Sequence, residues 1–252
     1  MINRLVVVLG GNGEVGKELI AEAVNSGATV IGITRNNKQN LFSENKNFTQ
    51  IQCDLSTEKN FDDLYKKISS LNPEKIDWIQ ATGHFTDYLR IDETANEDIL
   101  NQVEANLTST ILGVKMFTQL MKKIRNGNFI CFSSVSIGKA FPFMAVFNAT
   151  KAGIEELIAT VSSEVLFKEV TYNCLRLSTI KTPIEIKLKP HGDQENWFTP
   201  KDVAISTFDF INSLLSNKIR GATLPLYKPS TTYFHDSLTY RFEKTPDSFL
   251  KD

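Results

Sequence analysis

The chain has 252 residues, of which 41% are hydrophobic and 23% are charged, and its 28 basic and 29 acidic side chains give a formal net charge of −1. This composition is typical of a globular protein. The charges of opposite sign are balanced, so the sequence does not predict binding to nucleic acid or to an anionic membrane. No apolar run approaches the roughly 20 residues of a membrane span, and Leu5–Leu9 is too short for a signal peptide, so we expect a cytoplasmic protein.

Seven short apolar segments rich in β-branched residues predict strands that are buried on both faces, as parallel sheets require. Amphipathic stretches separate these segments, and the first of them is expected to end at Gly27 as a helix C-cap. The alternation predicts an α/β fold: a single-domain, Rossmann-like, doubly wound parallel sheet of about seven strands with helices on both faces, spanning residues 1–252. The predicted strands lie at residues 4–10, 28–34, 48–54, 75–82, 127–134, 171–178 and 221–227.

Two stretches interrupt this alternation. Residues 179–199 predict a substrate-covering loop, because loops after late strands of such sheets border the ligand site. Residues 230–252 predict a C-terminal tail. Cys53, Cys131 and Cys174 lie in apolar runs without metal-ligand spacing, so we expect buried free thiols and no metal site.

Directly after the first predicted strand comes the stretch GGNGEVG, which contains G-x-G-x-x-G. Between a buried strand and a helix this pattern indicates a dinucleotide site, because a Cβ would keep the pyrophosphate away from the backbone N–H groups at the helix N-terminus. An ordinary glycine-rich turn is the alternative. The residues expected at the phosphates are Gly10, Gly11, Asn12, Gly13, Glu14, Val15 and Gly16.

The second predicted strand ends in Thr34, Arg35 and Asn36, and this end bears on the choice of cofactor. NAD sites usually carry Asp or Glu about 20 residues beyond the glycines to hold the adenosine 2′-hydroxyl, and here that carboxylate is absent. The guanidinium of Arg35 suits a 2′-phosphate, so NADP is preferred over NAD. A solvated loop arginine is the alternative.

With these features in order, the chain resembles the short-chain dehydrogenase/reductase family from about Arg4 to Tyr227. The resemblance implies that Asp54 and the following Leu55 hold the adenine ring. It also implies that Thr182 contacts the nicotinamide end of the cofactor. Three residues at the end of the fourth predicted strand are implied to line the cofactor: Ala81, Thr82 and Gly83.

The same resemblance assigns the active site. Ser134 matches the family's substrate-orienting serine, Lys151 its ribose-binding lysine, and Asn106 the asparagine that helps to organise a proton-relay water. The family's catalytic tyrosine should stand 13 residues after the serine and four before the lysine. Both counts reach Phe147, so the phenol is absent rather than shifted.

Other positions also depart from the family pattern. Leu177 and Ser178 replace its Pro-Gly pair, and Glu14 stands where the commonest glycine motif has glycine. Residues 227–229 replace the D-G-G that closes the last strand. These departures mark a divergent member.

The missing phenol leaves the proton donor open. General acid catalysis contributes roughly 10² to 10⁴ in rate, so its loss predicts weakened rather than abolished carbonyl reduction. His84 follows a strand end in the expected site and imidazole titrates near neutrality, although a histidine that caps the strand is the alternative. Tyr88, Ser134 itself, or a water held by Asn106 and Lys151 are further candidates.

Retention of the site positions other than the tyrosine favours an NADP-dependent oxidoreductase of this type, acting on a small carbonyl or hydroxyl substrate with an altered proton donor. An NAD(P)-binding pseudoenzyme with a regulatory or scaffolding role, and a non-redox lyase or isomerase on the same fold, are the alternatives. The resemblance further implies a homodimer or homotetramer, assembled through the helix that contains Asn106 and the helix that begins near Phe147.

Overall fold

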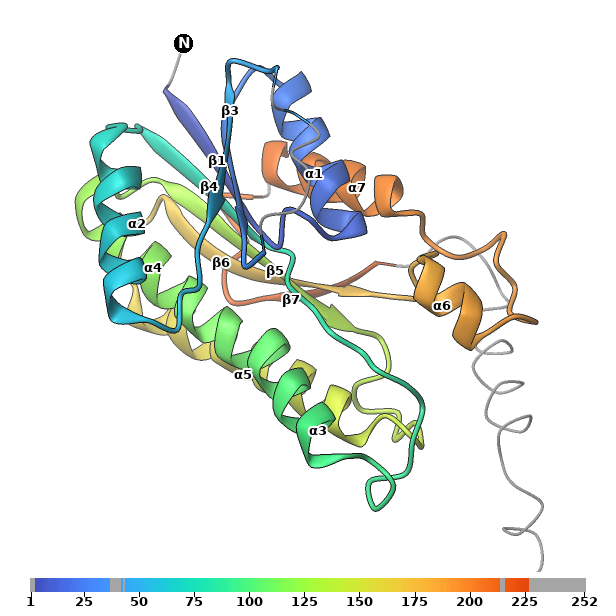
Figure 1. The fold of residues 1–252 in the computed structure, drawn as a ribbon. Coiled ribbons are helices and arrows are strands. Elements are labelled where there is room, and N and C mark those ends of the chain that lie inside the picture. Colours follow the sequence, from blue (N-terminus) through green and yellow to red (C-terminus); the bar gives the residue numbers. More distant parts are fainter. Residues whose placement is uncertain (1–2, 37–41, 43, 214–215, 227–252) are drawn as a thin grey trace, which may run out of the picture.

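A parallel sheet lies at the centre of the molecule (Figure 1). The computed structural model describes residues 3–36, 42, 44–213 and 216–226. In this part of the chain seven strands form one sheet in the order β3-β2-β1-β4-β5-β6-β7, and all neighbours are parallel. The strands are β1 (Arg4–Leu9), β2 (Thr29–Thr34), β3 (Phe48–Gln52), β4 (Lys75–Gln80), β5 (Gly127–Ser134), β6 (Val170–Leu177) and β7 (Thr223–Leu226). The predicted parallel α/β sheet is confirmed.

The apolar runs form strands because both of their faces are covered. In β1 the side chains of Val6 and Val8 enter one hydrophobic core, whereas those of Leu5, Val7 and Leu9 enter the other. Successive side chains of a strand point to opposite faces, so a continuous apolar run is what a sheet covered on both sides selects.

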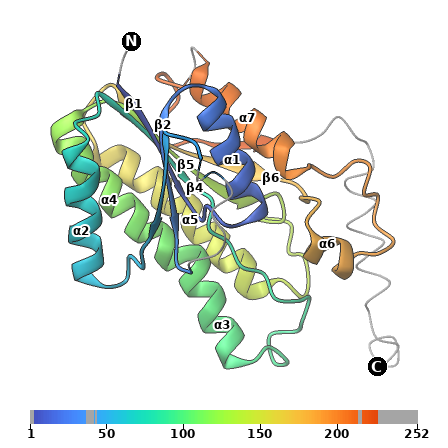
Figure 2. The same ribbon diagram turned by 45° about the horizontal axis from the view of Figure 1, so that its top comes forward.

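Helices cover both faces of the sheet (Figures 1 and 2). The core on the α1 and α7 side is separate from the core on the side of α2, α4 and α5. A π-helical segment, η1, joins α3 to α4. The helices are α1 (Glu14–Asn25), α2 (Glu58–Ser70), α3 (Asn96–Gln102), η1 (Val103–Thr108), α4 (Ser109–Ile124), α5 (Ala145–Glu164), α6 (Pro183–Leu188) and α7 (Pro200–Asn212).

Helix α1 follows from its sequence with one correction. Leu19, Ile20 and Ala23 form its buried face. Its C-cap is Ser26, and Gly27 comes one residue later with φ +78°. The left-handed conformation that turns the chain into β2 is required beyond the cap, where glycine adopts it without strain.

The carboxyl ends of β1 and β4 are where the chain leaves the sheet in opposite directions. β1 continues into α1 on one face, and β4 leads through α3 to α4 on the other. The two strands are adjacent, with Leu9 opposite Gln80. A crevice opens at such a switch point, so the glycine-rich turn and residues 81–83 lie side by side there.

Residues 179–199, predicted as a substrate-covering loop, contain a short helix. This helix is α6, which starts at Pro183 and lies beyond the carboxyl end of β6 (Figure 1). Ile180 pairs with Phe198 in a parallel bridge, and Trp197 is buried. The helix escaped prediction because six residues are too few to show helical periodicity.

The cysteines, possible metal ligands, membrane-spanning segments and the C-terminal residues were also considered in the sequence. The three cysteines are buried and free, as predicted. Among the described residues no group of His, Cys, Asp and Glu could hold a metal ion, and no helix is long and apolar enough to cross a membrane. The predicted tail at 230–252 and the replaced D-G-G at 227–229 lie outside the described residues.

Candidate active site

Two adjoining cavities lie along the carboxyl edge of the sheet. The smaller has a volume of about 360 Å³ and extends from Arg35 and Asp54 toward the end of β4. The larger, of about 550 Å³, extends from there to α6. Both are lined by Gly13, Ala81, Thr82 and Gly83, so the two cavities form one elongated site.

The glycine-rich turn is shaped by close backbone contacts. A Cβ on Gly10, whose φ is +94°, would lie 2.9 Å from the carbonyl of Ala81. A Cβ on Gly16 would lie 2.1 Å from the carbonyl oxygen of Gly10. Only glycine lets the turn pack onto both β4 and α1, and the N-terminus of α1 then faces the junction of the cavities at Gly13.

The other residues of the turn have distinct positions. Asn12 lines the smaller cavity and its Nδ2 donates to the carbonyl of Asn36 at 3.0 Å, which ties the turn to the end of β2. Glu14 and Val15 line the larger cavity, and the Glu14 carboxylate lies 3.2 Å from Lys17 Nζ. Gly11 and Gly16 line neither cavity and serve packing.

Arg35 stands at the rim of the smaller cavity, as its assignment to a 2′-phosphate requires. Its side chain is 60% exposed and donates to Glu104 Oε1 at 2.8 Å. Its partner Glu104 comes from η1 and was not predicted as a site residue. An exposed ion pair of this kind contributes about 0–1 kcal/mol, so Arg35 can leave it at little cost.

The predicted adenine-binding residues also line the smaller cavity. Asp54 Oδ1 accepts a hydrogen bond from the backbone N–H of Ser56 at 2.9 Å, and Leu55 is buried beside it. Thr82 Oγ1 lies 2.8 Å from both Gln80 Nε2 and Ser109 Oγ, which fixes the floor shared with the larger cavity.

Asn106 lies behind the wall of the larger cavity rather than in it. It is completely buried within η1. Its Oδ1 accepts from the backbone N–H of His84 at 2.8 Å, and its Nδ2 donates to the His84 carbonyl at 2.9 Å. Asn106 therefore holds the backbone after Gly83. The His84 ring is exposed at the cavity, with Nε2 3.3 Å from Thr86 Oγ1.

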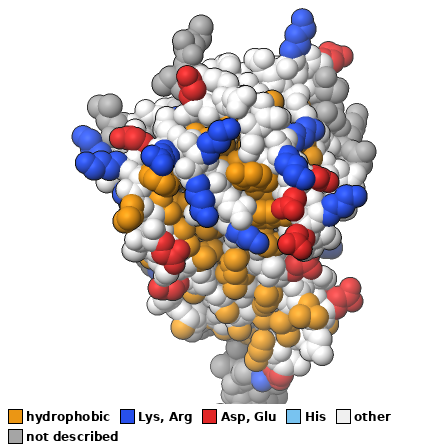
Figure 3. All heavy atoms as spheres, turned by 90° about the vertical axis from the view of Figure 1, so that its left-hand side faces the viewer, with side chains coloured by type: hydrophobic (Ala, Val, Ile, Leu, Met, Phe, Trp, Pro, Cys, Tyr) orange, Lys and Arg blue, Asp and Glu red, His pale blue; other side chains and the backbone are white. Residues whose placement is uncertain are grey.

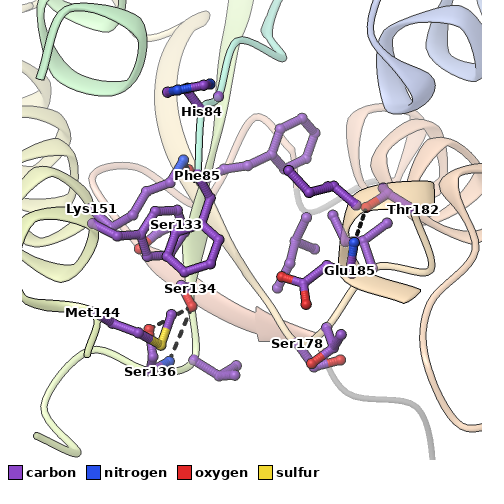
Figure 4. Close-up of a pocket in the computed structure, with 18 of the residues that line it drawn as sticks. His84, Phe85, Ser133, Ser134, Ser136, Met144, Lys151, Ser178, Thr182 and Glu185 are labelled. Atoms are coloured by element: carbon purple, nitrogen blue, oxygen red, sulfur yellow. Dashed lines mark hydrogen bonds between the residues drawn. The ribbon is translucent and has the colours of Figure 1, made fainter. Parts of the chain in front are cut away.

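Ser134 is held at the cavity wall by a chain of polar side chains. Its Oγ lies 2.7 Å from Ser136 Oγ and donates to it, because the single hydroxyl hydrogen of Ser136 goes to Asn148. Ser136 Oγ donates to Asn148 Oδ1 at 2.6 Å. The two serines face the cavity together (Figure 4), and neither Ser136 nor Asn148 was singled out in the sequence.

Phe147 and Lys151 lie one turn apart on α5 and both line the larger cavity. Lys151 is 6% exposed, and its Nζ donates to the carbonyl of Phe132 at 3.0 Å. Burial lowers the pKa of Lys151 from its ordinary value. The Phe147 ring packs edge-on against Phe85, with centroids 5.2 Å apart. The position predicted for the donor carries a ring without a hydroxyl.

A second set of charged residues braces this wall and was missed in the sequence. Glu155 Oε1 accepts from Ser133 Oγ and from Arg176 Nε, so one carboxylate joins β5, α5 and β6. Two signals were available: Arg176 interrupts an apolar strand, and Glu155 follows Lys151 by four residues on the same helix face.

The opposite wall of the larger cavity comes from α6. Thr182 lines the cavity as predicted, and its Oγ1 caps α6 by accepting from the Glu185 N–H at 3.3 Å. Figure 4 shows the Glu185 side chain directed into the cavity, across from Ser134 and Lys151. Glu185 was missed because α6 itself was missed.

The family assignment follows from the sequence and agrees with this geometry. The short chain dehydrogenase family model matches residues 4–193, so the chain belongs to this family. A curated relative is the bifunctional ribulose 5-phosphate reductase/CDP-ribitol pyrophosphorylase Bcs1 of Haemophilus influenzae, 27% identical over 195 residues. That match covers 76% of this chain and 38% of the relative, so the chain spans well under half of its length.

Solved structures share the fold. ElxO with NADP bound superposes with a TM-score of 0.79 at 21% identity, covering 93% of this chain and all of that one. 4-Hydroxyisoleucine dehydrogenase complexed with NADH has a TM-score of 0.74 at 19% identity, covering 91% of this chain and 99% of that one. The chain therefore shares its Rossmann-like fold with these solved structures.

Proposed function

We propose that the protein is an NADP(H)-dependent oxidoreductase that reduces a small carbonyl compound, or oxidises the corresponding alcohol, with a proton donor other than tyrosine. One observation carries the proposal: Ser134 and Lys151 line the same cavity, and this cavity continues into the one bordered by the glycine-rich turn. A pocket of this continuity suits a dinucleotide with its reactive end beside the serine and the lysine.

The choice of NADP over NAD rests on Arg35. Its guanidinium lies at the rim of the smaller cavity, where an adenosine ribose would lie, and its exposed partner Glu104 is easily replaced by a phosphate. Solved structures with this fold contain either cofactor: ElxO has NADP bound, and 4-hydroxyisoleucine dehydrogenase is in complex with NADH. The residues around Arg35 therefore decide the preference in this chain.

The roles of the site residues follow from their positions. Bound NADPH would supply the hydride. Ser134 Oγ accepts from the backbone N–H of Ser136 at 3.2 Å, and its hydroxyl hydrogen would turn from Ser136 Oγ to the substrate carbonyl oxygen and orient it. Lys151 makes one hydrogen bond with the described residues, to Phe132, so other N–H groups of its ammonium remain for the nicotinamide ribose and for a water.

The proton would come from Lys151 through that water. Hydride addition to the carbonyl carbon leaves an alkoxide, the water protonates it, and the Lys151 ammonium restores the water's proton and is recharged from solvent. An ammonium with a lowered pKa is a stronger acid than an ordinary lysine, which favours this transfer. His84 is less suited, because its ring is exposed and contacts Thr86 rather than Ser134.

One observation favours a second candidate function. Phe147 provides no phenol, and a nucleotide-binding protein without turnover, in a regulatory or scaffolding role, needs none. A lyase or isomerase on the same fold also has no need of the phenol. These alternatives differ from the proposal in whether carbonyl reduction occurs and whether nicotinamide absorbance changes.

The test combines binding and turnover. The protein is titrated with NADPH and NADH, and NADPH oxidation is then followed over a panel of ketones and aldehydes for wild type, Phe147→Tyr and Ser134→Ala. The proposal expects wild-type oxidation that depends on Ser134. NADPH binding with no oxidation, together with activity gained in Phe147→Tyr, supports the pseudoenzyme. Product formed without any absorbance change supports the lyase or isomerase.

We also propose that the chain forms a homodimer or homotetramer through the helical run α3–η1–α4, which contains Asn106, and through α5, which begins near Phe147. Leu100 of α3 and Ile111 of α4 are 67% and 44% exposed. Figure 3 shows apolar side chains gathered among Lys, Arg, Asp and Glu on the side of α2 and α4. Light scattering should give a dimer or tetramer mass, and Ile111→Lys should lower it; a wild-type monomer mass contradicts the proposal.

A further inference from the structure

Glu185 places a charged acceptor in the wall opposite the reacting residues. Its Oε2 is buried and makes no hydrogen bond with any residue that the structure describes. The carboxylate lies in a cavity whose other walls are largely apolar and aromatic, including Phe85, Phe141 and Phe143. Oε2 has no contact with solvent, so a ligand in the cavity would reach the carboxylate through its other oxygen, Oε1. A carboxylate that accepts no hydrogen bond from the described residues is unfavourable in such surroundings, so a ligand that donates a hydrogen bond to it would be bound selectively.

The local structure holds Glu185 in this direction. Pro183 sets the first turn of α6, and Thr182 Oγ1 caps the Glu185 N–H at 3.3 Å. Lys189 Nζ lies 3.6 Å from Glu185 Oε2, which is beyond hydrogen-bond distance but close enough for attraction. Lys189 in turn contacts the ring of Tyr88, 5.3 Å from its centroid. The carboxylate is thus oriented before any ligand enters.

The charge of Lys189 decides which kind of donor fits. The side chains of Glu185 and Lys189 are only 21% and 15% exposed, so their charges are weakly screened and largely compensate each other. A cationic amine brought to the Glu185 carboxylate would be repelled by Lys189. A neutral hydroxyl donates one hydrogen bond and adds no charge, so it is the favoured partner.

We propose that Glu185 is a specificity-determining residue that accepts a hydrogen bond from a hydroxyl group of the substrate, which is therefore a hydroxylated carbonyl compound with an apolar body. The carbonyl is held at Ser134, and the hydroxyl lies toward α6 across the cavity (Figure 4). The inference rests on the proposed function, because it takes Ser134 as the site of the reacting carbonyl.

The experiment compares matched substrates. Phenyl and alkyl ketones are tested with a hydroxyl on the first, second or third carbon beyond the carbonyl, and as deoxy and amino analogues. Wild type is expected to prefer one hydroxyl position over its deoxy analogue by about 10- to 100-fold in kcat/KM, as for a hydrogen bond to a charged group. The preference should lie in KM, because the hydroxyl is remote from the reacting carbon.

The variants assign the preference to Glu185. Glu185→Leu should bring the ratio of hydroxylated to deoxy substrate close to one, and Glu185→Gln, which keeps the size of the side chain, should reduce it. Lys187→Gln changes an exposed charge on the same helix and should leave the ratio unchanged. Equal kcat/KM for hydroxylated and deoxy ketones in the wild type, or a stronger preference for the amino analogue, overturns the proposal.

Two further readouts separate this inference from its premise. Affinity for the same compounds is measured by calorimetry with the NADPH-loaded protein, so an inactive enzyme still reports a hydroxyl preference. Binding preference that depends on Glu185 without turnover contradicts the proposed function and keeps the inference. Turnover with no preference for the hydroxylated compounds supports the proposed function and overturns the inference. If neither the hydroxylated nor the deoxy compound of any pair binds, the inference is also overturned. If Glu185→Gln instead weakens NADPH binding, the carboxylate serves the cofactor and the proposal fails.

Discussion

Lys151 Nζ lies 5.6 Å from the centroid of the Phe147 ring, one helical turn away on α5. A cation beside an aromatic face is stabilised by the ring quadrupole, so phenylalanine retains one interaction with the lysine while lacking the phenol. The lysine stays buried and donates to Phe132. Lys151 is therefore held beside a ring that carries no hydroxyl, and the following predictions depend on that arrangement.

Restoring the phenol should increase the rate. Phe147→Tyr is expected to raise kcat for ketone reduction by about 10²-fold or more, since a positioned general acid contributes roughly 10² to 10⁴. Steady-state NADPH oxidation measures the change. Phe85→Tyr is the control, because Phe85 lines the same cavity and contacts Phe147 but comes from the segment after β4. An unchanged kcat in Phe147→Tyr would show that the ring does not stand at the reacting oxygen.

The pH dependence of reduction should report Lys151. Proton donation needs the charged ammonium, and burial places its pKa below that of an ordinary lysine. The rate should therefore be full at low pH and fall as pH rises through this lowered pKa. Lys151→Arg should remove the decline, because arginine stays charged throughout, and should be slow at every pH. A wild-type profile that is flat to high pH argues against lysine as the donor.

Cofactor preference should depend on Arg35. Arg35→Ala is expected to weaken NADPH binding by about 10- to 100-fold, in line with losing a hydrogen bond to a charged phosphate, and to leave NADH binding unchanged. Fluorescence titration measures both affinities. Glu104→Gln is the companion variant: it removes the competing carboxylate and should not weaken NADPH binding. Equal losses for both cofactors would mean that Arg35 has a structural role only.

The carboxylate of Glu155, which accepts from both Ser133 and Arg176, should stabilise the fold. Glu155→Ala leaves Arg176 and Ser133 without their shared acceptor, and we expect the free energy of unfolding to fall by about 1–3 kcal/mol, below the value for fully buried pairs because Arg176 is partly exposed. Urea denaturation monitored by circular dichroism measures it. Glu156→Ala, the exposed neighbour, should change stability by less than about 0.5 kcal/mol. If the two variants lower the free energy of unfolding equally, the hydrogen bonds of Glu155 do not stabilise the fold as proposed.

Parts of the site that depend on backbone geometry could be predicted from the sequence. Gly10 and Gly16 are fixed by contacts that no Cβ permits, so their spacing is visible along the chain. Ser134, Phe147 and Lys151 were assigned by the resemblance to the family motif, whose spacing this chain keeps. Such constraints act between residues whose separation in space is set by regular structure.

Other parts could not be predicted, because they depend on pairs of side chains that tertiary structure brings together. Glu104 meets Arg35 across the smaller cavity, and Glu155 meets Arg176 across a helix and a strand. Glu185 depends on α6, whose six residues are shorter than the window in which helical periodicity is recognisable. Of these residues, Arg176 could have been noticed in the sequence, because it is a charged residue inside the apolar run of β6.

If the protein reduces a carbonyl compound at Ser134 without a tyrosine, hydride from the cofactor must appear in the alcohol product. The most direct measurement uses NADPH deuterated at the transferable position of nicotinamide C4, with mass spectrometry of the product. We expect wild type to form an alcohol that carries one deuterium, and Ser134→Ala to form much less of it. A protein that binds NADPH and yields no deuterated alcohol from any carbonyl compound tested would contradict this expectation.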